Sequence, residues 1–295
     1  MAQLIGIIAI FTAMETTLKK IKETLSPLYS QGEIKSLIKI ILGKLKGYSQ
    51  VDIIMHSDEI LSDYIKSEID KVLKRLLKNE PIQYIFNEAY FQGFTLKVTP
   101  STLIPRPETE ELVDIIVKDN TSCDLRILDI GTGSGAIAIA LARALRFPIV
   151  DAIDISDEAL SVAKENATML KAKVNFKKTD ILTASPTENQ YDIIVSNPPY
   201  ITNSERNKME INVLDYEPHT ALFVPDDDAL RFYRAIAIFA SKSLKPGGKI
   251  YFEINSRFGK ETATLLSENG FNEPTIAKDM YGLDRFVSAT KPYES

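Results

Sequence analysis

The segment Leu128-Asp129-Ile130-Gly131-Thr132-Gly133-Ser134-Gly135-Ala136 decides the fold class. The apolar run 125–130 predicts a buried strand and the alanine-rich stretch 136–145 predicts a helix, so the three glycines form the turn between them. Glycine permits a tight turn and lets a ligand approach the backbone closely. The spacing G-x-G-x-G differs from the dinucleotide fingerprint G-x-G-x-x-G, and no Lys-Ser/Thr pair follows. This disfavours a nicotinamide dehydrogenase and a phosphate-cradling nucleotide loop.

The chain after this loop continues as an alternation of strands and helices. Further strands are predicted at 148–153, 174–176, 191–196, 249–254, 274–277 and 285–290. Helices are predicted at 156–170, 226–244 and 260–268, the second ending at Pro246-Gly247-Gly248. Such alternation favours an α/β fold with a parallel sheet that helices cover on both faces.

The first 80 residues have helical periodicity instead. Apolar stripes predict three helices, and the third is expected to follow a Ser57 cap and to stop at Pro81. Its expected buried face consists of Ile60, Leu61, Tyr64, Ile65, Ile69, Val72, Leu73 and Leu76. We therefore predict a small helical bundle that has no catalytic cluster.

The apolar segment Leu4–Phe11 is too short to span a bilayer and lacks the basic start of a signal peptide. We expect it to form a buried or fraying first helix, and Met14 is an alternative start of the chain. Pro105 and Pro107 restrict the backbone before an acidic helix start, which places the domain junction there. The predicted parts are a helical domain at 1–85, a hairpin and linker at 86–110, and a sheet domain at 111–295.

Composition and charge exclude several classes of protein. Hydrophobic residues make up 44% and charged residues 25% of the 295 residues, as in ordinary globular proteins. The net charge is −5, and residues 1–90 carry 12 Lys and Arg against 11 Asp and Glu, without the basic excess of a phosphate-binding domain. Cys123 is the only cysteine and His56 and His219 are the only histidines, which excludes an intrachain disulfide and a Cys/His-rich metal site. We expect no metal and a reducing, cytoplasmic location.

Acidic residues follow the second and third strands of the sheet domain. Asp154 comes 23 residues after Gly131, where a carboxylate in a doubly wound sheet can accept both hydroxyl protons of a ribose. Asp180 follows the third strand, where an acceptor can reach an adenine amino group. The alternatives are a helix cap for Asp154 and an ordinary loop residue for Asp180. A glycine loop and two acids at three consecutive strand ends favour a nucleoside-bearing ligand.

The segment Asn197-Pro198-Pro199-Tyr200 directly follows the strand 191–196, at the sheet edge where ligands bind. An amide or aromatic amine nitrogen has a delocalised, weakly nucleophilic lone pair. The Asn197 side-chain oxygen and the Pro198 carbonyl can each accept one of its N–H groups, and Tyr200 can pack against its flat face. Positioning and preorganised polarity would then promote transfer from that nitrogen without a strong base. A rigid turn is the alternative interpretation.

The glycine loop, Asp154 and the Asn-Pro-Pro-Tyr segment resemble the S-adenosylmethionine-dependent methyltransferases that modify planar nitrogens. More closely, the chain is similar to bacterial peptide chain release factor glutamine methyltransferases over residues 15–290. The segments that carry this similarity are Pro81–Ile85, Ile104–Glu110, Val195–Tyr200 and Glu217–Leu222.

The resemblance implies a doubly wound, seven-stranded Rossmann-like sheet behind an N-terminal domain that docks the substrate. It implies methylation of the glutamine amide in the Gly-Gly-Gln motif of class 1 peptide chain release factors, with S-adenosyl-L-methionine as donor and S-adenosyl-L-homocysteine as product. The implied cofactor-binding residues are Gly131, Thr132, Gly133, Ser134, Gly135, Asp154, Asp180, Ile181 and Asn197. The implied substrate clamp is Asn197, Pro198, Pro199 and Tyr200, with Asn197, Pro198 and Tyr200 in the catalytic role.

Two other functions use the same features. An adenine amino-methyltransferase acting on DNA or RNA shares the Asn-Pro-Pro-Tyr chemistry, but it needs a basic target-recognition region that the nearly neutral helical part lacks. A non-catalytic S-adenosylmethionine-binding regulator has no need of an intact Asn-Pro-Pro-Tyr segment. We expect no membrane partner and no stable nucleic-acid partner. Arg106 and Glu108 are expected to border the mouth of the site, with a local ion pair as the alternative, and His219 is expected to form a structural hydrogen bond.

Overall fold

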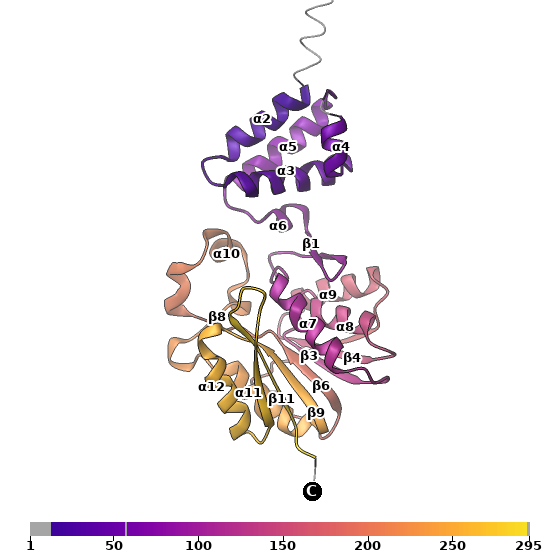
Figure 1. The fold of residues 1–295 in the computed structure, drawn as a ribbon, viewed down its shortest axis with the longest axis vertical. Helices are drawn as coiled ribbons and strands as arrows, with labels where there is room; N and C mark the ends of the chain where they lie inside the picture. Colours follow the sequence, from indigo (N-terminus) through magenta and orange to yellow (C-terminus); the bar gives the residue numbers. More distant parts are fainter. Residues whose placement is uncertain (1–12, 57, 294–295) are drawn as a thin grey trace, which may run out of the picture. The chain divides into compact units, whose positions relative to one another are not determined.

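A computed structural model describes residues 13–56 and 58–293 of the chain. The chain divides into two compact units, residues 1–86 and residues 87–295, which can be followed by colour in Figure 1. The helix expected at Leu4–Phe11 lies outside the described residues. Within the described part, no helix is long and apolar enough to cross a membrane.

The first unit is a helical bundle. Its helices are α2 (Ala13–Leu25), α3 (Gln31–Lys46), α4 (Gln50–Met55), α5 (Asp63–Leu76) and α6 (Ile82–Phe86). A capping box between Ser30 and Glu33 starts α3, and Gly47 ends it in the left-handed conformation with a φ of 74°. The apolar faces of α2, α3 and α5 form a core of their own.

The third predicted helix starts later than expected. Ser57 lies outside the described residues, and α5 begins at Asp63 because the Ser62 side chain accepts the N–H of Ile65. Ile60 is therefore outside the helix and 60% exposed, and Tyr64 lies one residue off the buried stripe and is 70% exposed. The expectation that these two side chains are buried is wrong. The short helix α4 was not predicted.

The second unit contains a seven-stranded sheet with the order β10-β11-β9-β6-β3-β4-β5. The strands are β3 (Arg126–Ile130), β4 (Ile149–Asp154), β5 (Val174–Lys178), β6 (Tyr191–Ser196), β9 (Leu244–Glu253), β10 (Asn272–Lys278) and β11 (Asp284–Thr290). Neighbouring strands from β9 to β5 are parallel, and the order reverses on either side of β3. This confirms the predicted doubly wound α/β fold. Its carboxyl edge at β3 is where ligands bind in such sheets.

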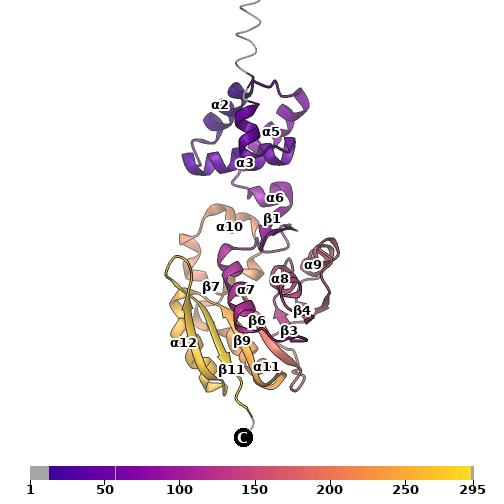
Figure 2. The same cartoon turned by 45° about the vertical axis from the view of Figure 1, so that its right-hand side comes forward.

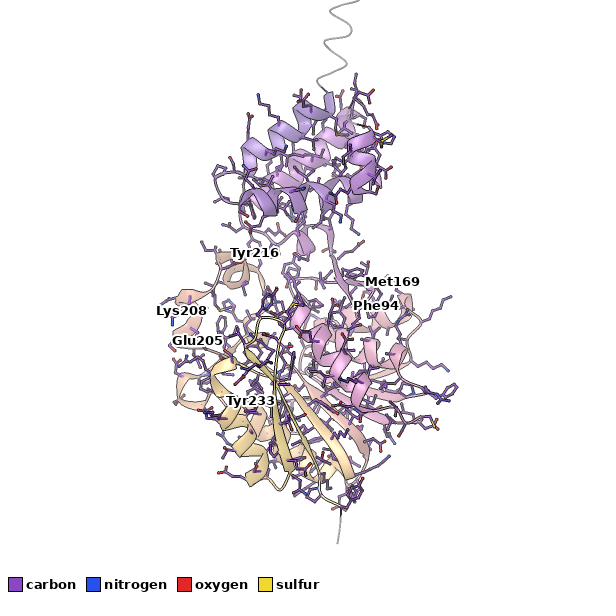
Figure 3. The ribbon with its side chains drawn as sticks, in the orientation of Figure 1. Phe94, Met169, Glu205, Lys208, Tyr216 and Tyr233 are labelled. Carbon is purple, nitrogen blue, oxygen red and sulfur yellow. The ribbon has the colours of Figure 1, made fainter. Side chains whose placement is uncertain are left out.

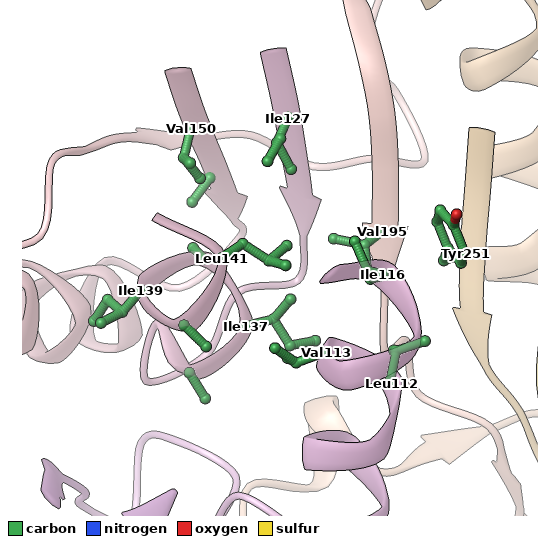
Figure 4. Close-up of a cluster of buried hydrophobic side chains, with 14 of the residues drawn as sticks. Leu112, Val113, Ile116, Ile127, Ile137, Ile139, Leu141, Val150, Val195 and Tyr251 are labelled. Atoms are coloured by element: carbon green, nitrogen blue, oxygen red, sulfur yellow. The ribbon is translucent and has the colours of Figure 1, made fainter. Parts of the chain in front are cut away.

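Helices cover both faces of this sheet (Figures 1 and 2). One face holds α7 (Pro107–Asp119), α8 (Ala136–Ala144) and α9 (Asp157–Met169), and the other holds α11 (Arg231–Ser243) and α12 (Gly259–Glu268). Successive side chains of a strand point to opposite faces, so Ile127 packs with α7 and α8 while Leu128 packs with α11. Figure 4 shows the first of these cores, with Val113 of α7 close to Ile137 of α8.

The starts of one helix and one strand in the sheet domain differ from the prediction by five residues each, and one strand is antiparallel to its neighbours. Helix α11 begins at Arg231 because a 3-10 turn, Asp226–Asp228, precedes it. Strand β9 begins at Leu244 and includes Pro246, because a bulge separates the pairs Tyr191–Leu244 and Ile193–Lys249. Strand β11 is antiparallel to both of its neighbours, whereas a parallel sheet was expected.

Two small elements stand outside the main sheet. A hairpin of β1 (Glu88–Phe91) and β2 (Phe94–Lys97) precedes α7, as predicted, and turns at Gln92 and Gly93, both with positive φ. After β6, the strands β7 (Ile201–Thr202) and β8 (Phe223–Val224) pair in parallel. Between them lie the 3-10 turn Asn203–Lys208, helix α10 (Ile211–Tyr216) and the 3-10 turn His219–Ala221.

Candidate active site

The glycine loop joins the end of β3 to the start of α8. Gly131, Gly133 and Gly135 have φ values of 74°, 55° and 83°, which other residues adopt only with strain. A Cβ at Gly131 or Gly133 would have no neighbour within 4 Å, whereas one at Gly135 would lie 3.0 Å from the Ile139 side chain. The first two glycines therefore leave backbone open to a ligand, and the third allows the start of α8 to pack against α9, where the Ala163 Cβ would lie 3.2 Å from an added Cβ.

Asp154, at the end of β4, supports this loop directly. Its Oδ2 accepts the N–H of Gly133 at 2.9 Å and its Oδ1 accepts the N–H of Ser156 at 2.9 Å. The N-cap of α9 is Ser156, whose side chain accepts the N–H of Ala159, so Asp154 is not the cap itself. A carboxylate oxygen has two lone pairs, so each Asp154 oxygen can still accept one ligand hydroxyl.

Asp129 lies near the end of β3, just before the glycine loop, and no function of its side chain was predicted from the sequence. It is fully buried, and its Oδ2 accepts the Thr132 hydroxyl at 2.7 Å and the Ala138 N–H at 3.2 Å. Its Oδ1 has no hydrogen-bond partner among the described residues. Burial, with a smaller contribution from the charge of Asp154, raises the pKa of Asp129 from 3.8 to about 7.

This raised pKa predicts a pH-dependent stability. Between about pH 4 and 7 the folded chain keeps a proton on Asp129 that the unfolded chain releases, so stability falls as pH rises through that window. Relative to Asp129→Asn, which cannot titrate, the wild-type protein should lose on average about 1.1 kcal/mol of unfolding free energy per pH unit from pH 5 to 7, because the limiting slope of about 1.4 kcal/mol per unit halves at a pKa of about 7. Urea unfolding followed by circular dichroism at several pH values measures this difference.

The difference between the two proteins should become constant above pH 8, which provides an internal control. A general destabilisation by the asparagine changes the difference in unfolding free energy by the same amount at every pH. It therefore does not change how that difference varies with pH. Parallel stability curves between pH 5 and 7 would contradict the assignment.

Asp180 and Ile181 follow β5 in a turn. Asp180 Oδ1 accepts the N–H of Leu182 at 2.9 Å, and its carbonyl accepts the N–H of Thr183. Ile181 is partly buried against the core that β3 shares with α11. The backbone N–H of Thr179, which precedes this pair, donates to the Asp154 carbonyl at 2.9 Å, so the turn lies next to the end of β4.

A pocket of about 130 Å³ lies at the ends of β6 and β9. Four parts of the chain line it: the stretch before α7, the residues after β6, the segment between β7 and β8, and the last residue of β9. The lining residues are Leu103, Arg106, Asn197, Tyr200, Ile201, Met209, Val213, Ala221, Leu222 and Glu253. The structure thus brings Asn197, Tyr200 and Arg106 together. Pro198, Pro199 and Glu108 do not line this pocket.

Hydrogen bonds hold the pocket walls in place. The Asn197 Nδ2 donates to the Thr109 hydroxyl at 3.3 Å, and that hydroxyl donates to Glu253 Oε2 at 2.7 Å. The Tyr200 hydroxyl donates to Glu253 Oε1 at 3.1 Å. Tyr233 of α11, labelled in Figure 3, donates to the Glu253 backbone carbonyl at 3.1 Å. Burial raises the pKa of Glu253, and burial followed by the nearby Glu253 charge raises the pKa of Tyr200.

Arg106 is paired with Glu217 and not with Glu108. The guanidinium lies 2.5 Å from Glu217 Oε1, and Oε2 of the same carboxylate accepts the N–H of Ile104. Glu217 is only 4% exposed, so Arg106 neutralises a buried charge while it borders the pocket. The alternative of a local Arg106–Glu108 ion pair is therefore wrong. The bond also joins two of the segments on which the resemblance rested.

His219 has a structural contact, as expected. Its ring Nε2 donates to the Leu214 backbone carbonyl at 2.8 Å, and its ring meets Phe223 edge-on.

Asn255, just after β9, donates to the Tyr200 carbonyl at 3.2 Å and to Glu205 Oε2 at 3.0 Å. These two contacts stabilise the segment around β7 from both sides. No group of three or more His, Cys, Asp or Glu that could hold a metal occurs in the described part of the chain.

Comparison with known proteins decides the family. Residues 108–214 match the methyltransferase small domain and residues 16–86 match the PrmC N-terminal domain. The chain is 47% identical to the release factor glutamine methyltransferase of Bacteroides thetaiotaomicron, over 92% of this chain and 98% of that protein. The chain belongs to the release factor glutamine methyltransferase family. The resemblance read from the sequence is thereby confirmed.

Other members of the family are also similar along most of their length. The release factor glutamine methyltransferase of Flavobacterium psychrophilum is 44% identical over 90% of this chain and 94% of that protein. The crystal structure of a methyltransferase from Pyrococcus furiosus superposes with a TM-score of 0.51 at 19% identity, covering 74% of this chain and 97% of that one. That likeness concerns the fold alone.

Sequence reasoning missed four residues that shape the pocket of this family member. Thr109 and Glu217 stand inside the motifs that carry the resemblance, but nothing in their spacing shows which side chains they meet. Glu253 carries a usable signal, because it is an acid within the apolar strand Ile250–Ile254, where a buried charge needs a partner. Asn255 follows that acid at the same sheet edge. An acid near the end of a predicted central strand is therefore a candidate site residue in the same way as Asp154.

Proposed function

We propose that this chain transfers a methyl group from S-adenosylmethionine to the side-chain amide nitrogen of glutamine in the Gly-Gly-Gln motif of class 1 peptide chain release factors. The observation that carries the proposal is the pocket that Asn197 and Tyr200 line at the end of β6, on the same sheet edge as the glycine loop. The names of the relatives, which cover nearly the whole chain, support the same substrate.

The cofactor would bind at the ends of β3, β4 and β5. The open backbone at Gly131 and Gly133 leaves room for a ligand, and the free lone pairs of Asp154 suit two neighbouring ribose hydroxyls. Thr132, Ser134 and Gly135 complete the loop, and Asp180 and Ile181 form the adenine edge. S-adenosylmethionine supplies a methyl group that is activated by a positively charged sulfur.

The substrate amide would enter the pocket beside Asn197. The Asn197 Oδ1 accepts one N–H of the glutamine amide and the Pro198 carbonyl accepts the other, while Pro199 stiffens the turn. Tyr200 packs against the flat amide, and its hydroxyl is held by Glu253. Arg106 borders the pocket and Glu108 lies in the first turn of α7. These groups act by orientation and preorganised polarity, so a strong base is not required.

One incubation tests the proposal against its rivals. The protein is mixed with methyl-labelled S-adenosylmethionine, a release factor, the same factor with its Gly-Gly-Gln glutamine changed to alanine, and DNA or RNA. Label on the unchanged factor alone is the expected result. Label on nucleic acid would indicate an adenine amino-methyltransferase. Binding of the cofactor without any labelled product would indicate a non-catalytic regulator.

We further propose that residues 1–85 dock the body of the release factor. Within the helical bundle, α4 exposes Val51, Ile54 and Met55 at 65%, 68% and 71%. Exposed apolar side chains grouped on one short helix are typical of a protein-binding surface. The exposed side chains Ile60 and Tyr64 follow directly along the chain. Residues 86–110 then act as hairpin and linker, and residues 111–295 carry the transfer chemistry.

The docking role predicts a substrate-dependent loss. Ile54→Glu with Met55→Glu should raise KM for a full release factor by about 10-fold, since a buried apolar contact at an interface contributes more than about 1 kcal/mol. A short Gly-Gly-Gln peptide should be methylated at the wild-type rate. Leu28→Glu, at a residue 50% exposed in the same unit, is the matched control. Equal losses on protein and peptide would contradict docking.

The proposed location is the cytoplasm, because the proposed substrate is a translation factor and Cys123 is a free thiol. Class 1 release factors are the proposed partners.

A further inference from the structure

A continuous chain of hydrogen bonds joins two residues that line the pocket, the buried carboxylate of Glu253 and the side-chain amide of Asn197. It runs from Glu253 Oε2 to the Thr109 hydroxyl and from there to the Asn197 side-chain amide, over 2.7 Å and 3.3 Å. Glu253 is 1% exposed and Thr109 is 4% exposed, so solvent does not compete for these bonds. The three residues come from β9, α7 and the segment after β6.

The chemistry of these groups gives the chain a direction. An ionised carboxylate can only accept hydrogen bonds, and a threonine hydroxyl has a single hydrogen to donate. Because Thr109 gives that hydrogen to Glu253, it can only accept from Asn197. Asn197 must therefore turn its Nδ2 towards Thr109, which leaves its Oδ1 for a ligand in the pocket. The opposite orientation would present an N–H group to the pocket.

We infer that Glu253 is a positioning residue which, through Thr109, fixes the Asn197 amide with its oxygen towards the substrate. The inference rests on the proposed function and deepens it, since an acceptor at this place selects substrates that offer an N–H, such as a primary amide. The same carboxylate accepts the Tyr200 hydroxyl at 3.1 Å, so one buried charge orients two walls of the pocket.

The buried charge also makes the orientation sensitive to pH. Burial raises the pKa of Glu253, Glu108 of α7 adds to this, and Arg285 of β11 opposes it, while the Thr109 and Tyr200 hydroxyls stabilise the ionised form. Tyr233 of α11 reaches only the backbone of Glu253. As pH falls through this raised pKa, Glu253 gains a proton and can donate it to Thr109. The Thr109 hydrogen is then free to point at Asn197, whose amide can reverse.

The decisive experiment observes Asn197 directly and needs no release factor. In the full-length protein with 15N-labelled asparagine, the Asn197 side-chain NH2 signal is identified by its loss in Asn197→Ala and followed over the whole pH range in which circular dichroism shows the protein to be folded. In the wild-type protein the signal should shift in a single titration. The shift should vanish in Glu253→Gln and in Thr109→Val, which removes the hydroxyl at nearly constant shape. A signal that titrates identically in wild type and both variants would overturn the inference.

Kinetics give the second readout. Thr109→Val should lower kcat for the release factor by about 10-fold, the loss expected for one hydrogen bond of this kind, with little change in the affinity for S-adenosylmethionine. Thr109→Ser, which keeps the hydroxyl, should retain kcat within about threefold of wild type by the same reasoning. The acidic limb of the kcat profile in the wild-type protein should match the NMR midpoint and be absent in Glu253→Gln.

The outcomes separate this inference from the proposed function. If no release factor is methylated by the wild-type protein, the proposed function fails while the NMR titration still reports on Asn197. If methylation occurs and folded Thr109→Val keeps the wild-type kcat and its acidic limb, the positioning role fails alone. Equal thermal midpoints of wild type, Thr109→Val and Thr109→Ser exclude a merely structural effect.

Discussion

Replacing Asn197 with alanine should lower the rate of methyl transfer to a release factor by about 100- to 1000-fold, the usual cost of removing one preorganised polar contact from a reacting group. The alanine removes the side-chain oxygen that we propose as the acceptor of the substrate N–H. It also leaves the Thr109 hydroxyl without the Nδ2 that donates to it at 3.3 Å. Binding of S-adenosylmethionine should largely persist, because the glycine loop and Asp154 are untouched. Single-turnover rates and calorimetric titration measure the two effects separately.

Two further variants sharpen this experiment. Asn197→Asp keeps an acceptor but adds a negative charge close to buried Glu253, so an intermediate loss is expected. Asn175→Ala changes an asparagine on β5 whose amide bonds to Asp151, outside the pocket, and should leave the rate unchanged. Near wild-type methylation by Asn197→Ala would show that the amide-clamp mechanism is wrong.

Replacing Asp154 with alanine should weaken S-adenosylmethionine binding by about 10- to 100-fold, since hydrogen bonds to a charged group contribute about 1.5–3 kcal/mol. The variant loses the two carboxylate oxygens that we propose as acceptors of the ribose hydroxyls. It also releases the Gly133 N–H, which Asp154 holds at 2.9 Å, so the loop itself becomes less well ordered. Titration calorimetry measures the affinity, and circular dichroism checks that the protein remains folded.

The matched control for this variant is Asp157→Ala. Asp157 is a neighbouring acid whose ion pair with Lys178 is exposed to solvent, so its loss should leave cofactor affinity unchanged. An Asp154→Ala protein that is folded and binds with wild-type affinity would disprove the assignment of Asp154 to the ribose.

The sequence predicted the fold well where the spacing of apolar residues shows which face of a strand or helix is buried. The strand at Tyr191–Ser196 and the helix capped by Ser156 came out as expected. Prediction failed where distant contacts decide. The bulge that lets β9 begin at Leu244 depends on pairing with β6, and the reversed direction of β11 depends on the whole sheet. Neither leaves a signal in the local sequence.

The same division holds in the site. Gly131–Gly135, Asp154 and Asn197 follow strand ends, so the topology alone gathers them at one edge. Thr109 and Glu253 are 144 residues apart, and their bond follows from the packing of α7 against β9. Many side chains together determine how α7 packs against β9. The residue types at positions 109 and 253 and the spacing between them therefore do not predict this contact.

The parallel pairing of β7 with β8 has an evolutionary consequence. Ile201 pairs with Phe223, so the chain leaves the sheet domain and returns to it about one strand spacing away, roughly 4.8 Å. The segment between these two points, which includes Met209 and Val213 of the pocket, is therefore an insertion whose two ends lie side by side. Insertions, deletions or exchanges between Glu205 and Glu217, whose side chains hold the ends of this stretch to Asn255 and Arg106, strain the surrounding scaffold little. Changes confined to that stretch would alter the pocket wall at Met209 and Val213 and would leave the ends of β3, β4 and β6 unchanged.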